Sequence, residues 1–148
     1  MSEVKPERAL YLRLKENLRD CLITRIESRV NLGIPDCLIA FSRVGRFVMV
    51  ELKVVKRGRQ VALSPHQVAF HLKHASLGCP TFILVQYHPP GTTSSLKAEL
   101  RLYRGDQVEA LLVRGIDEPP VESWMLAKVD WQMLRGLMAG LDTGKKAE

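Results

Sequence analysis

The sequence predicts an α/β fold in which helices flank a mixed central sheet, with a hairpin and a helix at the C-terminal end. Short apolar runs that suit buried strands alternate with segments whose apolar residues recur at helical spacing. Hydrophobic residues make up 46% and charged residues 26% of the 148 residues, which is the composition of a globular chain able to bury a core. We expect one domain at 1–148, with a core at about 6–86 and a C-terminal extension at about 96–141.

The first helix is expected from about Pro6 to Asp20, because proline suits the first turn of a helix. Its apolar residues recur at helical spacing and form one face: Leu10, Tyr11, Leu14, Leu18 and Cys21. At about 100° per residue, Glu7 falls near the middle of this face and Glu16 on the opposite side. An extended stretch at 23–30 follows the helix.

Two β-rich runs come next, at 36–41 and 46–55, and Gly45 between them predicts a β-hairpin. Both runs are apolar almost throughout, as expected of strands that are covered on both faces. A second helix is expected to begin at Ser64-Pro65, where serine suits the N-cap and proline the first helical position, and to end at Gly78. A buried strand is expected after it.

That strand should cover 81–86, and a linker rich in Pro, Gly, Ser and Thr follows it. The C-terminal extension is expected to contain a hairpin at 96–113 that turns at Gly105-Asp106. A helix should close the chain at about 121–141, with Trp124 and Trp131 packed into the core.

The net charge of +6 favours a polyanionic partner such as nucleic acid. No apolar run approaches the roughly 20 residues that a membrane-spanning helix needs, and the N-terminal residues form no apolar signal region. The three cysteines, Cys21, Cys37 and Cys79, lack the spacing of a zinc site and suit a reducing compartment. These features predict a cytoplasmic protein that does not contact membranes.

The residues that suggest chemistry are Pro35-Asp36 and Glu51-Leu52-Lys53. If the hairpin turns near Gly45, Asp36 lies opposite Glu51 to Lys53 on the antiparallel partner strand. Because side chains alternate along a strand, Glu51 and Lys53 share one face and Leu52 points to the other. Two carboxylates and an ammonium group are therefore expected to converge at one end of the hairpin.

Charged side chains within an apolar strand are costly unless they are paired or bound to a metal. Magnesium held by Asp36 and Glu51 would offset this cost, because Mg²⁺ prefers a few carboxylates together with water and phosphate oxygens. The ion would lower the pKa of a bound water and shield a scissile phosphate, and Lys53 would orient or help deprotonate that water. The pattern therefore favours magnesium-dependent hydrolysis of phosphodiester bonds.

This pattern resembles the PD-(D/E)xK nuclease superfamily: Pro35-Asp36, fourteen intervening residues, then Glu51-Leu52-Lys53. The segment Leu63-Ser64-Pro65-His66-Gln67 is similar to the LSPxQ that opens the next helix in the VRR-NUC branch, where the glutamine faces the active site. This branch is similar to Holliday junction resolvases, and related small nucleases are common in phages. The resemblance covers about 6–86 and implies a restriction-endonuclease-like fold.

The resemblance also implies an activity and its requirements. It implies a DNA endonuclease that is selective for branched or junction DNA, that uses Mg²⁺ or in its place Mn²⁺, and that works in a bacterial or phage-infected cell. Gln67 would join Asp36, Glu51 and Lys53 as a catalytic residue. A homodimer would pair two such sites for cutting two strands, with the segment after residue 95 as its interface.

Nucleases of this kind usually place a further acid on the first helix. Glu7 matches that role because it lies on the apolar face of the helix, and Glu27 competes with it because it lies closer to the turn before Asp36. The resemblance further implies that the backbone carbonyl of Leu52 is a metal ligand. The sequence leaves both Glu7 and Glu27 as candidates for this further acid.

The basic loop directly after the Glu51–Lys53 strand offers contacts to DNA. We expect Lys56, Arg57 and Arg59 to bind phosphates, although a loop of this composition can also be merely solvated. His71, on the same helix as Gln67, is a further candidate for a contact with nucleic acid.

Each of these residues also has a purely structural interpretation. Asp36 can be a turn residue, Glu51 and Lys53 an exposed edge-strand pair, and Glu7 a partner of the helix dipole. The functional alternatives are a catalytically inactive nucleic-acid-binding module and a virion or interaction protein on the same fold. A buried charged group of three favours the nuclease, because a protein that only binds has no need of it.

Overall fold

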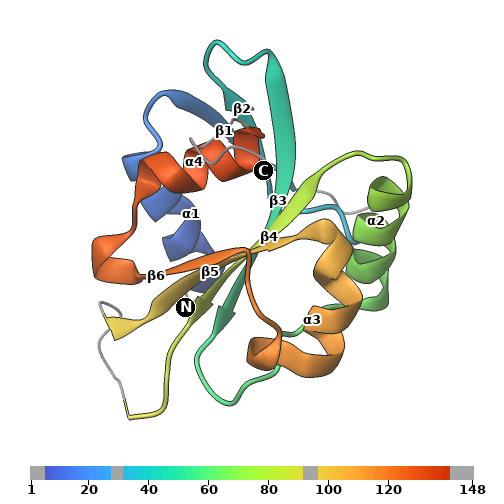
Figure 1. Cartoon of the computed structure of the whole chain (residues 1–148), viewed down its shortest axis with the longest axis vertical. Coiled ribbons are helices and arrows are strands. Elements are labelled where there is room, and N and C mark those ends of the chain that lie inside the picture. The colour runs from blue at the N-terminus through green and yellow to red at the C-terminus, as the bar shows by residue number, and fades with distance from the viewer. Residues whose placement is uncertain (1–5, 28–31, 92–96, 141–148) are drawn as a thin grey trace, which may run out of the picture.

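A computed structural model describes residues 6–27, 32–91 and 97–140. Four helices and six strands account for most of these residues (Figure 1). In chain order they are α1 (Pro6–Asn17), β1 (Cys21–Arg25), β2 (Cys37–Phe41), β3 (Arg46–Val55), α2 (Pro65–Ser76), β4 (Thr81–Tyr87), β5 (Glu99–Arg104), α3 (Val108–Arg114), β6 (Glu122–Met125) and α4 (Trp131–Ala139). Three short 3₁₀ turns, η2 (Gly105–Gln107), η3 (Gly115–Asp117) and η4 (Leu126–Lys128), connect the later elements.

The six strands form a single mixed sheet in the order β1-β2-β3-β4-β5-β6. Only β3 and β4 run parallel, because α2 crosses over between them, and every other neighbouring pair is antiparallel. The α/β class with a mixed central sheet is therefore confirmed.

Helices cover both faces of the sheet (Figure 1). On one face α1 and α4 pack against apolar residues that include Ile39, Val50 and Leu84. On the other face α2 and α3 pack against a second cluster that includes Ile83 and Val85. Because neighbours on a strand alternate, Leu84 and Val85 belong to different layers of the core.

Local sequence accounts for the boundaries of α2. The hydroxyl of Ser64 accepts a hydrogen bond from the backbone N–H of Gln67 at 3.1 Å, and the side-chain oxygen of Gln67 accepts one from the backbone N–H of Ser64 at 2.9 Å. This reciprocal capping box satisfies two N–H groups that a helix start leaves unpaired. After the helix, Gly78 adopts a φ of +74°, which glycine accommodates without strain.

The predicted hairpin at 96–113 is wrong. Residues 99–104 do form β5, but it pairs with β4 and β6, and the chain then enters η2 and α3 instead of a returning strand. Val108 and Leu111, three residues apart, point into the core from one face of α3. This is helical spacing, and it overrides the strand-like composition of the segment.

The predicted helix at 121–141 is also wrong in its first half. Residues 122–125 form β6, which pairs along the free edge of β5, and the helix begins only at Trp131. Trp124 therefore lies on a strand, whereas Trp131 lies on α4. The backbone of residues 122–125 forms hydrogen bonds with β5 in place of the hydrogen bonds within a helix. The sequence does not predict this pairing, because β5 becomes a neighbour only in the folded protein.

Coverage of β3 is incomplete, contrary to the expectation for the run at 46–55, and the neighbouring part of β1 is also exposed. Phe47 is 64% exposed and Leu22 is 70% exposed, because α2 packs near β4 and leaves this part of the sheet open. Among the cysteines, Cys37 is buried and Cys79 is exposed. No helix in the described parts of the chain is both long and apolar enough to cross a bilayer.

Candidate active site

Asp36 is placed by the hairpin of β2 and β3. Their register pairs Cys37 with Val50, so the next step along the hairpin sets Asp36 beside Glu51. The Asp36 carboxylate also accepts a hydrogen bond from the backbone N–H of Leu52, with 2.7 Å between Oδ2 and N. Asp36 is thus fixed to β3 although it stands just before β2.

Glu51 and Lys53 lie on the face of the sheet that α2 covers. Their neighbours on the parallel strand β4 are Ile83 and Val85, which belong to the core layer under α2. Leu52 points to the opposite layer and is buried there. Glu51 is only 1% exposed, so a carboxylate stands inside the core of the protein.

Gln67 joins Glu51 to Lys53 from the first turn of α2. Its side-chain N–H donates to Glu51 Oε2 at 3.2 Å, and its side-chain oxygen accepts from the Lys53 ammonium at 3.0 Å. The same oxygen caps α2 through Ser64. One side chain therefore fixes the start of the helix and the relative position of an acid and a base.

Burial makes both carboxylates costly to ionise. The pKa of Asp36 is raised to about 7, chiefly by burial, with contributions from the hydrogen bond with Glu51 and from the negative charge of Glu51. Burial likewise raises the pKa of Glu51, while the hydrogen bond with Asp36 and the charge of Lys53 oppose the rise. A bound cation would offset this cost, because it stabilises the ionised form of both carboxylates.

The donor set fits a hard divalent cation. Glu51 Oε1 is buried and, among the residues that the structure describes, accepts no hydrogen bond. Over the described residues, no group of three His, Cys, Asp or Glu side chains is arranged to hold a metal ion. A cation here would therefore depend on two carboxylates with water or phosphate oxygens, which is the way magnesium usually binds.

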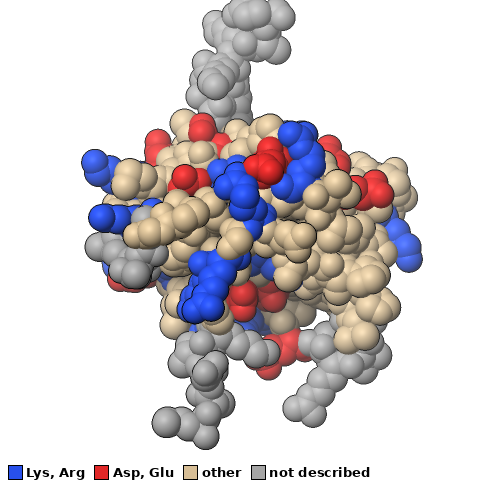
Figure 2. All heavy atoms as spheres, turned by 90° about the horizontal axis from the view of Figure 1, so that it is seen from below, with Lys and Arg blue, Asp and Glu red and all other residues tan. Residues whose placement is uncertain are grey.

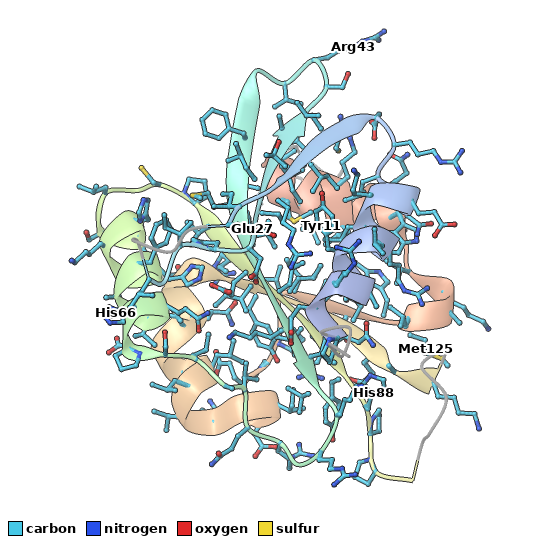
Figure 3. The ribbon with its side chains drawn as sticks, turned by 180° about the vertical axis from the view of Figure 1, so that it is seen from behind. Tyr11, Glu27, Arg43, His66, His88 and Met125 are labelled. Atoms are coloured by element: carbon cyan, nitrogen blue, oxygen red, sulfur yellow. The ribbon has the colours of Figure 1, made fainter. Side chains whose placement is uncertain are left out.

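The structure distinguishes Glu7 from Glu27. Glu7 is half-buried and lines a small pocket together with Tyr11, Arg25, Asp36 and Leu52, and its negative charge contributes to the raised pKa of Glu51. The Glu27 side chain is 83% exposed, lies 3.8 Å from Arg25 and does not line this pocket. Figure 3 labels Tyr11, which lines the pocket from α1, and Glu27, which lies after β1 and does not line it.

Two residues of this pocket were not singled out as functional from the sequence. Tyr11 stands one helical turn after Glu7, so the spacing alone could have placed it beside that acid. Arg25 reaches the pocket only because β1 pairs with β2, which brings it opposite Cys37. No local signal predicts that pairing.

The basic loop after β3 divides into two parts. Lys56 and Arg57 are exposed, and the structure records no ion pair for either among the residues it describes. The Arg59 guanidinium forms an ion pair with Asp117 of η3 and donates a hydrogen bond to the Tyr87 hydroxyl at 3.3 Å. Seen from below, basic and acidic side chains share one face of the molecule, and acidic ones near its centre lie in a hollow (Figure 2).

The expected contact between His71 and nucleic acid is wrong. Its side chain is completely buried behind Glu51, because this face of α2 packs against the sheet. The pKa of His71 is lowered to about 4, chiefly by burial and further by the charges of His74 and Lys53, so the imidazole is neutral. His71 belongs to the interior of the site and not to its surface.

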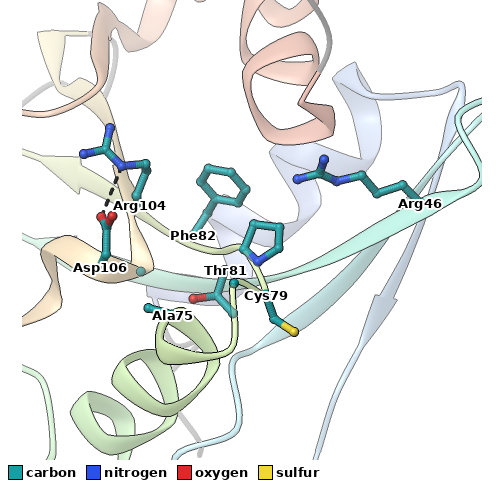
Figure 4. A pocket seen from close by; sticks show the side chains of 10 residues that line it. Arg46, Ala75, Cys79, Thr81, Phe82, Arg104 and Asp106 are labelled. Atoms are coloured by element: carbon teal, nitrogen blue, oxygen red, sulfur yellow. Dashed lines mark hydrogen bonds and ion pairs between the residues drawn. The ribbon is translucent and has the colours of Figure 1, made fainter.

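A second pocket lies at the start of β4, near the beginning of β3. Arg46 and Arg104 approach it from opposite sides, and Arg104 is paired with Asp106 (Figure 4). Among the described residues, Asp106 is the only acidic side chain that lines it, so this part of the chain offers no paired carboxylates there like those at the end of the hairpin. Asp36 and Glu51, and not this pocket, therefore form the candidate active site.

Comparison with known proteins gives a structural likeness only. No protein-family model matches the chain, and no curated protein does. Fifteen chains of solved structures match, among them Hjc, a Holliday junction resolvase from the archaeal hyperthermophile Archaeoglobus fulgidus. That match has a TM-score of 0.44 and 18% identity, and it covers 68% of this chain and 77% of Hjc. We base the function below on the side chains of the site and not on this likeness.

Proposed function

We propose that this protein is a magnesium-dependent deoxyribonuclease of the PD-(D/E)xK type that cuts branched or junction DNA. The observation that carries the proposal is the half-buried Asp36 beside the buried Glu51, with Lys53 held next to them by Gln67. A module that only binds nucleic acid would have no use for two costly buried carboxylates. Selectivity for branched DNA rests on the resemblance of the motifs to VRR-NUC nucleases and resolvases.

Asp36 and Glu51 would hold the metal, with the backbone carbonyl of Leu52 and Glu7 as further candidates. When bound, Mg²⁺ would lower the pKa of a water molecule and neutralise charge on the phosphate. Lys53 would orient that water or help to deprotonate it, and its ammonium would stabilise charge on the scissile phosphate. Gln67 would keep the Lys53 ammonium and the Glu51 carboxylate in fixed relation, which limits the reorganisation that the reaction needs.

The DNA backbone would bind beside this site. Lys56 and Arg57 follow the strand of Glu51 and Lys53 by a few residues and are exposed to solvent. The net charge of +6 would assist the approach of a polyanion. Mn²⁺ would replace Mg²⁺, because it accepts the same oxygen ligands. A homodimer working inside the cell would allow two strands of a junction to be cut together.

The decisive experiment is a cleavage assay with labelled four-way junction, flap, nicked, single-stranded and linear duplex DNA. Each substrate is incubated with Mg²⁺, Mn²⁺, Ca²⁺ or EDTA. We expect cleavage with Mg²⁺ or Mn²⁺, fastest on branched DNA, and none with EDTA or in the Asp36→Asn variant. Binding without cleavage under every condition would contradict the proposal and favour the inactive binding module.

A further inference from the structure

His71 stands directly behind Glu51, and the two side chains face each other with unsatisfied atoms. His71 Nε2 lies 3.8 Å from Glu51 Oε1, and both atoms are buried with no hydrogen-bond partner in the described parts of the chain. The other ring nitrogen, Nδ1, lies 2.6 Å from the hydroxyl oxygen of Thr81. The oxygen of Glu51 that Gln67 leaves free is therefore the one that His71 faces.

The hydrogen bond to Thr81 decides which ring nitrogen carries the proton. A neutral imidazole has one N–H and one acceptor nitrogen. For the Thr81 hydroxyl, the described residues provide no recorded acceptor other than His71 Nδ1. If the hydroxyl donates to Nδ1, the proton lies on Nε2 and points toward Glu51. The opposite tautomer would set a nitrogen lone pair against a carboxylate oxygen in a buried site and leave the hydroxyl proton unused.

The C-terminal extension packs against Thr81 and His71 through Gly105. A Cβ atom added to Gly105 would collide with Thr81 Oγ1 and come within 3.2 Å of His71 Nδ1. Gly105 is buried at the start of η2 and packs next to α2. Figure 4 shows Thr81 at the start of β4, close to the end of α2 and to the segment after β5. Only a glycine allows the backbone of η2 to approach Thr81 and His71 so closely.

We propose that His71 is a positioning residue for the Glu51 carboxylate, with its Nε2–H directed at Glu51 by the hydrogen bond from Thr81. The extension that contains Gly105 holds Thr81 in place. His71 thus acts on the metal ligand and does not touch the metal or the DNA. Partners of a ligand side chain set its orientation, and their loss typically lowers metal affinity by about 10- to 100-fold. This inference rests on the proposed function, since it assigns Glu51 to the metal.

The first test reads the tautomer directly in the metal-free protein. Long-range ¹H–¹⁵N spectra of protein labelled at histidine distinguish the two neutral tautomers, and the signal of His71 is identified by its loss in His71→Gln. We expect the Nε2–H tautomer, and a shift toward a mixture in Thr81→Val, which keeps the volume of the side chain and removes the hydroxyl. Thr24→Val, at an exposed position on β1, is the matched control and should leave the His71 signal unchanged. A pure Nδ1–H tautomer in the wild type would overturn the inference.

The second test measures Mn²⁺ affinity by the loss of the free-ion signal in electron paramagnetic resonance. We expect Thr81→Val and His71→Phe to bind Mn²⁺ about 10-fold more weakly than the wild type. In His71→Gln, the side-chain amide can still donate to Glu51, so this variant should stay within about 3-fold of wild-type affinity. Equal affinity in His71→Phe and the wild type would contradict the positioning role.

A third comparison separates positioning from simple packing. Thr81→Ala leaves a space, and Gly105→Ala adds a methyl group that fills it in the double variant. We expect the melting temperature of the double variant to recover toward the wild type while its Mn²⁺ affinity stays low. If affinity follows the melting temperature through the whole series, His71 and Thr81 only stabilise the fold.

The inference and the proposed function can fail separately. DNA cleavage by the wild type together with an Nδ1–H tautomer at His71 would refute only the role of His71. An Nε2–H tautomer and weakened Mn²⁺ binding in Thr81→Val, without cleavage of any DNA by the wild type, would refute only the nuclease activity.

Discussion

The carboxylate of Asp36 accepts a hydrogen bond from the backbone N–H of Leu52 at 2.7 Å, across the hairpin of β2 and β3. The interior of the sheet therefore holds Asp36 next to Glu51 without help from a bound ion. An asparagine at this position keeps an oxygen that can accept the same hydrogen bond. The fold and the chemistry of the site can thus be separated by mutation.

We predict that Asp36→Asn, Glu51→Gln and Lys53→Ala each lower the cleavage rate by about 100-fold or more while the protein stays folded. Removing a charge from a buried cluster can even stabilise the fold. Cleavage rates and circular dichroism of each variant check this, with Glu109→Gln, on α3 and away from the site, as the control. Wild-type rates in any folded member of the three would rule out the assigned site.

The raised pKa of Asp36 predicts how stability depends on pH. Its folded value is about 7 against an ordinary value of 3.8, so the folded state binds more protons than the unfolded state between these limits. This contribution is fully present below about pH 4 and is lost as the pH rises through about 7, and Glu51 acts in the same direction. We expect Asp36→Asn to be more stable than the wild type at pH 8, with the difference shrinking toward pH 4.

Chemical denaturation of both proteins across this pH range, without divalent metal, tests that expectation. A difference that is constant with pH would mean that folding does not shift the pKa of Asp36. Added Mg²⁺ should raise the melting temperature of the wild type at pH 8 and much less at pH 5, because protons compete with the metal for the same carboxylates. Asp36→Asn should show little rise at either pH.

We predict that Glu7→Gln lowers the cleavage rate by about 10-fold, whereas Glu16→Gln and Glu27→Gln have little effect. Glu7 lines the pocket with Asp36, whereas Glu16 and Glu27 are exposed. Rates measured over a range of Mg²⁺ concentrations should show that Glu7→Gln needs more metal. A larger loss in Glu27→Gln than in Glu7→Gln would assign the further acid to Glu27.

Gln67 allows capping and catalysis to be compared within one helix. Ser64→Ala and Gln67→Ala each disrupt the capping box of α2, and each should lower the free energy of unfolding by about 1 kcal/mol. Only Gln67→Ala also removes the link between Lys53 and Glu51, so only this variant should lose about 10-fold in cleavage rate. Equal losses of activity in both variants would reduce Gln67 to a helix cap.

The basic loop should account for part of the salt dependence of DNA binding. We expect Lys56→Ala/Arg57→Ala to lower the slope of log K against log salt by up to about 2, since each lost phosphate contact removes about 0.9. Adding Arg59→Ala should change the slope less than one contact would, because Arg59 is paired with Asp117. Labelled junction DNA is titrated in Ca²⁺ at several salt concentrations, with Lys73→Ala/Lys128→Ala as an exposed control pair. An unchanged slope would place the DNA-binding charge elsewhere.

Short-range features of the sequence determine most of the candidate site. The meeting of Asp36 with Glu51 follows from a turn at Gly45 and two strands of regular alternation, and all of these lie within one hairpin. The start of α2 follows from Ser64 and Gln67, which are three residues apart. Neighbours in sequence supply these contacts, so composition and spacing are enough to predict them.

Only the tertiary structure decided the remaining features. Residues 122–125 form a strand because β5 offers a free edge, and His71 is buried because that face of α2 meets the sheet. The presence of Glu7 and not Glu27 in the pocket with Asp36 likewise depends on where α1 lies against the hairpin. Each of these outcomes is set by hydrogen bonding or burial against residues distant in sequence, and local propensity carries no information about such partners.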